Sequence, residues 1–279
     1  RKAMKIIILH DADARIEYLD VADHLLGSDI EEFLTRQGFS VNNITWLVTS
    51  ADHIPVVYHK YDIDYRLGMR GVKTKGGIGS VKQFYHSVSI ASEDLFSATK
   101  YILDNAATLK VDPDNLVICG SSAGAMTVLQ TEWLLCNGKA TEALPEGFRY
   151  AGVMSFSGAI LSREGMPKYA QTPAPTAFFH GTADKVVNYK KIRVFNWVFA
   201  GTNQLVRIFK RNGYTYNAYR YQGHTHEIAD SMVETFPDQI RFLETNITRK
   251  VARTVDSTID DPEAPAPSGS ANRKEMYEN

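Results

Sequence analysis

The chain has 279 residues, of which 44% are hydrophobic and 23% are charged, and its formal net charge is −1. This composition is that of a globular chain with ample material for a buried core. No dense cluster of Lys and Arg indicates binding to nucleic acid or to an anionic membrane surface. The two cysteines, Cys119 and Cys136, are not expected to form a disulfide.

The N-terminal stretch Met4–Leu9 begins like a secretion signal. Its apolar run stops at His10, which makes it too short for a signal peptide or a membrane span. No run of about 18 apolar residues occurs elsewhere, so the sequence predicts no transmembrane segment. Lys5–Leu9 instead predicts a short buried strand.

The first sixty residues show few clear signals after that strand. Acidic residues at one end and Gly38 at the other predict a helix over Asp29–Gly38. Three stretches that follow are rich in β-forming residues, and at least two are expected to be core strands: Phe39–Val41, Ile44–Thr49 and Ile54–Tyr58.

Apolar residues recur at helical spacing from Ser80 to about Ala107. Ser80 with Gln83 forms a capping box, which predicts where the helix begins. The pattern fits one long helix or two helices that are broken near Ser89–Ser92.

A strand-like run at Leu116–Cys119 leads into Gly120-Ser121-Ser122-Ala123-Gly124, and a helical pattern then continues to Cys136. This is the strand–turn–helix context that the G-x-S-x-G nucleophile elbow requires. The tight turn strains Ser122, and the two glycines leave room where side chains would clash. The motif predicts an exposed serine hydroxyl at a helix N-terminus, where developing negative charge is stabilised.

Strands and helices alternate through the rest of the readable chain, with an irregular stretch at Ala159–Pro175. The predicted strands are Tyr150–Gly158, Thr176–His180 and Tyr214–Tyr221, and the predicted helices are Asn188–Ala200, Asn203–Asn212 and Asp238–Ile247. This alternation predicts an α/β fold with a mostly parallel central sheet and helices on both faces. We expect one domain over residues 1–250, with an atypical N-terminal part, and a disordered tail over residues 251–279, where large apolar residues become rare.

A serine hydroxyl needs a base within hydrogen-bond reach, and that base needs an orienting carboxylate. Asp184 follows the strand that ends at His180, and His224 and His226 follow the strand that ends at Tyr221. Such groups meet at the carboxyl edge of a parallel sheet. The chain order Ser122, Asp184, His is the one expected of an α/β-hydrolase elbow.

Four stretches resemble α/β-hydrolases of the carboxylesterase and lipase type, near the bacterial esterases that deacylate plant polysaccharides. They are Asp64–Leu67, Gly120–Ala125, Phe179–Val187 and Gly223–Ile228. The resemblance covers about residues 61–248. It implies the α/β-hydrolase fold, Ser122 as the nucleophile, Asp184 as the acid and a histidine of the last loop as the base. It further implies a small-molecule or carbohydrate ester substrate, no metal or cofactor, and by analogy an exported protein.

Two histidines compete for the role of the base. The family often has Gly-His in this loop, which selects His224, and often His-Glu, which selects His226. We favour His226 and expect the other to line the site or bond the loop backbone. His180 is predicted to be a loop-packing residue.

The sequence identifies only one of the two hydrogen-bond donors that an oxyanion hole needs. The backbone N–H of Ala123 can serve as one donor. The family's His-Gly-Gly-Gly segment, which supplies the second, has no equivalent in residues 1–60. His10–Ala12 stands where such a segment would lie if Ile6–Leu9 were the equivalent core strand.

Two other functions fit parts of the pattern. A peptidase of the same fold would use the same residues, but such enzymes usually carry a large extra domain. A non-catalytic binding protein with a vestigial triad would explain the missing glycine-rich segment, although the retained Ser, Asp and His speak against it.

Overall fold

The computed structural model describes residues 4–10, 15–21, 36, 44–49, 66, 77–232 and 234–260. The chain divides into two compact units, Arg1–Asp62 and Ile63–Asn279. The sequence predicted one domain over residues 1–250 with an atypical first part. The structure instead gives that part a unit of its own, and each unit is described separately.

The N-terminal unit contains a three-stranded antiparallel sheet in the order β2-β1-β3. Its strands are β1 (Met4–His10), β2 (Arg15–Val21) and β3 (Ile44–Thr49). Lys5–Leu9 and Ile44–Thr49 are therefore strands, as predicted. The predicted burial of their side chains lies outside what the structure describes. Apart from Arg36, the helix predicted at Asp29–Gly38 and the remaining β-rich stretches lie outside the described residues.

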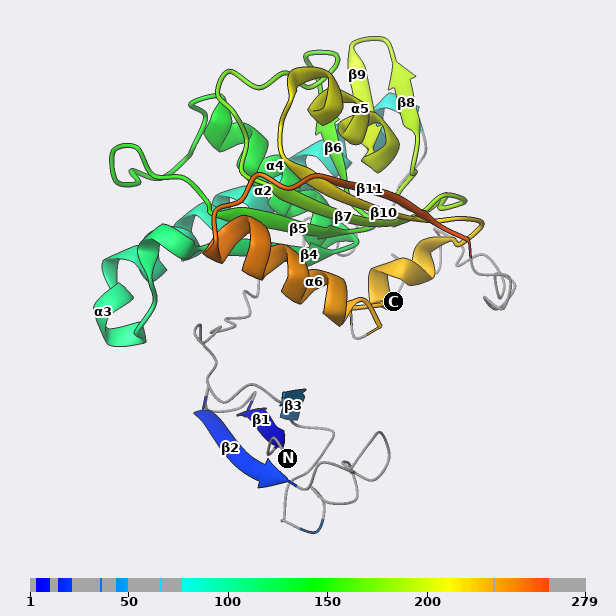
Figure 1. The fold of residues 1–279 in the computed structure, drawn as a ribbon. Helices are drawn as coiled ribbons and strands as arrows, with labels where there is room; N and C mark the ends of the chain where they lie inside the picture. Colours follow the sequence, from blue (N-terminus) through cyan, green and yellow to red (C-terminus); the bar gives the residue numbers. More distant parts are fainter. Residues whose placement is uncertain are drawn as a thin grey trace. The chain divides into compact units, whose positions relative to one another are not determined.

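The second unit is built on a five-stranded sheet in the order β11-β10-β7-β5-β4 (Figure 1). Its strands are β4 (Val117–Ser121), β5 (Gly152–Phe156), β7 (Thr176–Gly181), β10 (Tyr216–Tyr221) and β11 (Val255–Ile259). Every neighbouring pair is parallel. The carboxyl ends of all five strands therefore lie at one edge of the sheet, as the sequence predicted.

The helices are α2 (Gly77–Asp104), α3 (Ala106–Leu109), α4 (Ala123–Cys136), α5 (Thr202–Asn212) and α6 (Phe236–Phe242). α2 is one unbroken helix, although it begins three residues before the predicted cap at Ser80. Two short 3-10 helices, η2 (Pro113–Asn115) and η3 (His226–Asp230), precede β4 and follow β10. The predicted closing helix is α6, continued by the wider helical turns of η4 (Leu243–Thr248).

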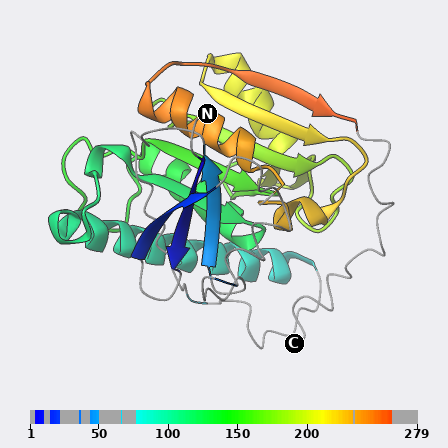
Figure 2. The ribbon, with the colours of Figure 1, turned by 60° about the horizontal axis from the view of Figure 1, so that its bottom comes forward.

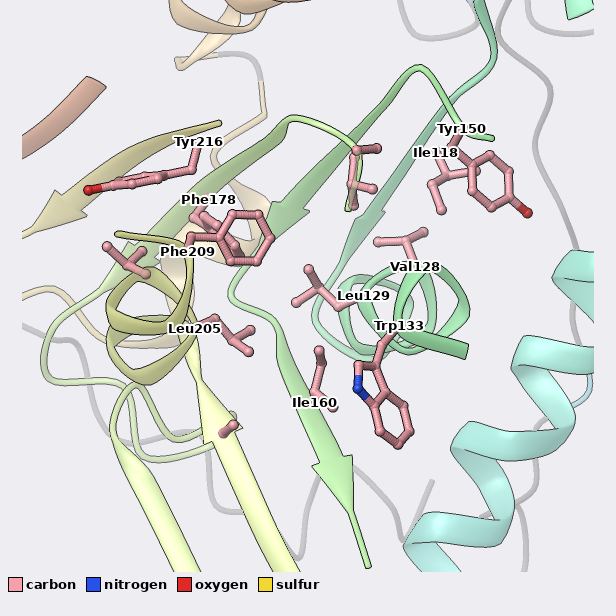
Figure 3. Packing of buried hydrophobic residues seen from close by; sticks show 14 of the residues in the cluster. Ile118, Val128, Leu129, Trp133, Tyr150, Ile160, Phe178, Leu205, Phe209 and Tyr216 are labelled. Atoms are coloured by element: carbon pink, nitrogen blue, oxygen red, sulfur yellow. The ribbon is translucent and has the colours of Figure 1, made fainter. Parts of the chain in front are cut away.

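Both faces of the sheet are covered, which requires near-continuous apolar strands. On one face, α4 and α5 pack against β5, β7 and β10 through Leu129, Leu205, Phe209 and Phe178 (Figure 3). On the other face, α6 and η4 pack their apolar side chains on Phe156 and Phe179 and on their neighbours (Figures 1 and 2). All six residues of β7 are buried accordingly.

A second, smaller sheet has the order β6-β9-β8, with β6 (Ala159–Ser162), β8 (Lys191–Val194) and β9 (Trp197–Gly201). The helix predicted over Asn188–Ala200 is therefore wrong. Along β9, Val198 and Ala200 are fully buried, whereas Trp197 and Phe199 are only partly buried. A period of two is the pattern of a strand rather than of a helix.

The C-terminal boundary also differs from the prediction. Residues Val255–Ile259, which the sequence placed in a disordered tail from residue 251, form β11 and pair with β10. Arg220 of β10 forms an ion pair with Asp256. An edge strand needs few apolar residues because only part of it is buried, so composition alone did not reveal it.

Candidate active site

Ser122 occupies the turn between β4 and α4 in a strained conformation, with φ 50° and ψ −113°. A non-glycine residue with positive φ is rare and persists only where its surroundings enforce it. Here the Ser122 N–H donates to the carbonyl of Phe156 on β5 at 2.8 Å. A side chain on Gly120 would clash with the Gly124 carbonyl, so this turn depends on glycine as predicted.

The Ser122 hydroxyl lies within hydrogen-bond distance of His226. The distance from Ser122 Oγ to His226 Nε2 is 2.8 Å, and that from His226 Nδ1 to Asp184 Oδ2 is also 2.8 Å. A carboxylate can only accept, so Nδ1 carries the proton and Nε2 is left to accept the serine proton. The three side chains come from the carboxyl ends of β4, β7 and β10.

Asp184 is held from both of its oxygens and is 3% exposed. Oδ1 accepts hydrogen bonds from the backbone N–H groups of Val186 at 2.8 Å and Val187 at 3.1 Å. Burial alone would raise the pKa of Asp184, but hydrogen bonds from His180 and His226 outweigh it and leave the pKa below its ordinary value. The acid is therefore ionised at neutral pH.

His180 also contacts the acid, which sequence reasoning missed. Its Nε2 lies 3.1 Å from Asp184 Oδ2 and 3.0 Å from the Val187 carbonyl oxygen, and its Nδ1 lies 2.8 Å from Thr202 Oγ1. The side chain is fully buried. The two residues are four apart across a tight turn, a spacing that permits this contact but does not predict it.

His224 stands apart from this chain of hydrogen bonds. Its Nδ1 lies 3.2 Å from Glu227 Oε1, and its ring packs edge-on against Tyr221. Its backbone carbonyl accepts a hydrogen bond from the Ala183 N–H at 2.9 Å. A side chain on Gly181 would clash with the carbonyls of His224 and Thr225, so glycine lets the histidine loop approach β7 closely.

A family model described as phospholipase/carboxylesterase matches residues 86–245, which is more than half of the chain. The chain belongs to this family. It therefore has the α/β-hydrolase fold and is a serine hydrolase of the carboxylesterase type, as the strand order and the elbow indicate. No curated protein matches the chain.

Solved esterase structures also resemble the chain. Esterase PE8 is 21% identical, with a TM-score of 0.43, over 62% of this chain and 68% of that one. Esterase 2 of Thermogutta terrifontis with bound butyrate is 22% identical, with a TM-score of 0.40, over 56% of this chain and 66% of that one. The same esterase phosphoramylated by tabun is 21% identical, with a TM-score of 0.42, over 56% of this chain and 64% of that one. The match thus spans about two thirds of the length of each relative.

A serine hydrolase of this family needs donors for the oxyanion. The Ala123 N–H is the first of α4, and the first N–H groups of a helix have no partner within it. The equivalence proposed for Ile6–Leu9 is wrong, because β1 pairs antiparallel with β2 and β3 instead of joining the sheet of β4. Of the Asp64–Leu67 motif, only Arg66 is described, and it forms an ion pair with Asp94 of α2.

Within the described ranges, no group of three or more His, Cys, Asp and Glu residues is arranged to hold a metal ion. The same part of the chain contains no helix that combines the length and the hydropathy needed to span a membrane.

Proposed function

We propose that Ser122, His226 and Asp184 are the catalytic triad with which this enzyme cleaves a carboxylic ester. The observation that carries the proposal is the continuous chain of hydrogen bonds from Ser122 Oγ through both ring nitrogens of His226 to Asp184 Oδ2. Its three members were predicted from the sequence with these roles. His224 lies outside the chain of hydrogen bonds, which favours His226 as the base.

In the first half of the reaction, Ser122 Oγ attacks the acyl carbonyl while His226 Nε2 takes the hydroxyl proton. The resulting imidazolium is stabilised by the Asp184 carboxylate. When the tetrahedral intermediate collapses, the bond to the alcohol breaks, and His226 passes the proton to the departing oxygen. The acyl group is then bound to Ser122 as an ester.

In the second half, water enters in place of the alcohol and gives its proton to His226 Nε2. The hydroxide attacks the acyl-enzyme, the bond to Ser122 Oγ breaks, and the proton returns to the serine. In both halves the negative charge develops beside the N-terminus of α4. The Ala123 N–H and the positive end of the helix dipole stabilise it there.

For the substrate, we propose a short acyl ester of a small molecule or of a carbohydrate. The carbohydrate part rests on the resemblance to polysaccharide esterases. Tyr216 and Tyr219 of β10 are buried in the sheet and cannot belong to an open sugar platform. Hydrolysis of nitrophenyl acetate, acetylated xylan and an aminoacyl anilide by the same preparation separates a general esterase, a carbohydrate esterase and a peptidase.

The nucleophile is tested with Ser122→Ala and a nitrophenyl acetate assay. Removing a member of a working triad costs about 10⁴-fold or more in turnover, so the variant should approach the uncatalysed rate. A fluorophosphonate probe should label the native chain and leave the variant unlabelled. Equal hydrolysis by both chains would disprove the assignment, and a native chain that resists the probe would favour a vestigial triad.

The base is tested with a matched pair of histidine variants. His226→Ala should lose about as much activity as Ser122→Ala, because neither Ser122 nor the leaving alcohol then has a proton partner. His224→Ala removes an imidazole of the same loop that has no bond to Ser122 or Asp184, and should lose less than about tenfold. The reverse order of the two losses would make His224 the base.

A further inference from the structure

The hairpin of β8 and β9 exposes large apolar side chains to solvent. Five large hydrophobic side chains are exposed in the part of the chain that the structure describes, and three of them are Ile192 (40% exposed), Val194 (39%) and Phe195 (78%). Grouped apolar exposure of this kind marks an interaction site, whereas single exposed residues are normal.

The tip of this hairpin is an unfavourable place for a phenylalanine. Val194 pairs with Trp197, so Phe195 and Asn196 form a two-residue turn, and Phe195 has φ +54°. Glycine and asparagine are the residues that tolerate this conformation in hairpin turns. A phenylalanine at this position is unfavourable both for its backbone conformation and for its exposure to solvent. A binding partner that covers the ring would explain why the residue is present.

The charged side chains of the hairpin itself are all cations. Arg193 lies near the tip, Lys190 and Lys191 lie at the base, and all three are exposed. The exposed carboxylate Glu164, next to the Gly165 that bonds to Asn196, forms an ion pair with Lys139. From residue 185 to residue 226 the sequence has eight Lys and Arg residues and no Asp or Glu, although the whole chain has a net charge of −1. These cations are spread along the sequence and do not form a dense cluster, and the total composition conceals their asymmetry.

The hairpin is fixed at its base next to the acid of the active site. Tyr189, which precedes β8, donates its N–H to the Asp184 carbonyl at 3.3 Å, and its ring packs edge-on against His180. Gly201, which ends β9, donates to the Lys190 carbonyl at 3.1 Å. Near the tip, the Gly165 N–H donates to the Asn196 carbonyl at 2.9 Å. The exposed side chains are therefore presented by a structured element.

We propose that the β8–β9 hairpin docks this enzyme on an anionic phospholipid surface. Phe195, Ile192 and Val194 would enter the headgroup region, and Lys190, Lys191 and Arg193 would contact lipid phosphates. Aromatic and aliphatic side chains beside cations are the combination that binds such an interface. Docking depends on the hairpin alone and not on the triad.

A second copy of this chain and a different protein both fit the hairpin less well than a lipid surface does. In a symmetric dimer through this hairpin, the cations of one copy would face those of the other, which opposes association. A stable protein interface buries about 800 Å² on each partner, more than one short hairpin offers. A lipid surface needs only a few inserted side chains and their flanking charges.

The test is co-sedimentation of the 279-residue Ser122→Ala chain with vesicles, so that turnover plays no part. We expect binding to an equal mixture of phosphatidylcholine and phosphatidylglycerol, little binding to phosphatidylcholine alone, and weakening by salt. The Phe195→Asn change should reduce binding at least about tenfold. Asparagine suits this turn, so the melting temperature of the Phe195→Asn variant should be unchanged or higher. Unfolding therefore cannot explain a loss of vesicle binding.

The matched control is Tyr101→Ser, which removes the exposed aromatic ring of α2 (62% exposed) and should leave binding unchanged. The double change Lys190→Gln and Lys191→Gln should weaken binding about tenfold or more and flatten its salt dependence. The proposal is overturned if the parent chain ignores the mixed vesicles, or if Phe195→Asn binds them as well as Tyr101→Ser does. Dimerisation without lipid that Phe195→Asn abolishes would assign the hairpin to a second copy.

Discussion

At the residue scale, two imidazoles share one carboxylate oxygen. Asp184 Oδ2 lies 2.8 Å from His226 Nδ1 and 3.1 Å from His180 Nε2. Nε2 of His180 faces two acceptors, this carboxylate and the Val187 carbonyl, so it must carry the proton. His180 therefore donates to the same carboxylate oxygen as His226, and this second hydrogen bond helps to hold the Asp184 side chain in place.

This arrangement makes His180 a positioning residue, which Leu and Gln substitutions can test. His180→Leu removes the donor and should lower kcat by about 10- to 100-fold with little change in KM, because a small displacement of the acid misorients His226. His180→Gln keeps an N–H near the position of Nε2 and should recover most of the lost activity. Equal losses of kcat in the two variants, at matched thermal stability, would reduce His180 to a packing role.

The residues of the proposed triad were all named from the sequence, because each belongs to a local motif. Ser122 follows from its elbow, and Asp184 follows from a turn after a strand. The sequence supports only a preference for His226 over His224. The two histidines lie in the same loop, and the sequence does not show which side chain points toward Ser122. The contact of His180 with Asp184 could not be read from the sequence, because it depends on how the turn folds back.

At the scale of elements, α4 holds the elbow at its N-terminus and buries a carboxylic acid near its C-terminus. Glu132 is 3% exposed. Its Oε1 accepts from the Ala174 N–H at 2.7 Å and from Cys136 Sγ at 3.2 Å, while its other oxygen has no partner in the described part. Burial raises the pKa of Glu132 above its ordinary value, and these hydrogen bonds offset only part of that effect.

A raised carboxyl pKa makes the fold less stable as pH increases. The folded chain keeps the Glu132 proton more tightly than the unfolded chain, so stability is lost as pH rises from about 4.3, the ordinary pKa of glutamate. Glu132→Gln removes this dependence. Its melting temperature relative to the native chain should therefore be higher at about pH 8 than at about pH 5.

Glu146→Gln is the control, because Glu146 is exposed and should give the same difference at both pH values. A constant difference for Glu132→Gln as well would mean that Glu132 does not titrate with folding.

The predicted elements were correct where local pattern and tertiary context agree. The long helix α2, the elbow strand and α5 have strong periodicity or clear end signals, and all three occur where expected. The helix predicted at Asn188–Ala200 was wrong because the prediction used the number of apolar residues and not the period at which they recur. The actual β8–β9 hairpin is stabilised by β6, which is distant in sequence.

At the scale of the whole molecule, the sheet brings the three residues of the proposed triad together from segments far apart in sequence. Parallel strands need long crossover connections, so Ser122, Asp184 and His226 are separated by whole helices and meet only at the carboxyl edge. The mostly parallel sheet with helices on both faces could be anticipated from the alternation of strands and helices. The division at Asp62 and the fifth strand could not, since both depend on pairing and not on composition.

The contacts of β11 indicate how far the C-terminus of the second unit can be shortened. β11 adds the ion pair of Asp256 with Arg220, a hydrogen bond from Tyr216 to Asp256 at 3.1 Å, and one from the Gln222 N–H to the Ile259 carbonyl at 2.8 Å. Val255 and Ile259 pack against the core beneath α6. A chain that stops after residue 250, as the sequence boundary implied, would leave Arg220 and the edge of β10 without these partners.

Two truncations isolate this contribution. A chain that ends at Asp260 keeps β11, and a chain that ends at Arg253 loses it while keeping the bond from Asn246 to the Arg253 carbonyl. The shorter chain should melt about 5 to 10 °C below the longer one, as expected for losing a few kcal/mol of burial and hydrogen bonding in a domain of this size. Coincident thermal transitions would show that β11 is dispensable and that the sheet effectively ends at β10. Because the two chains differ only in residues 254–260, a gap between their transitions can be assigned to the strand itself.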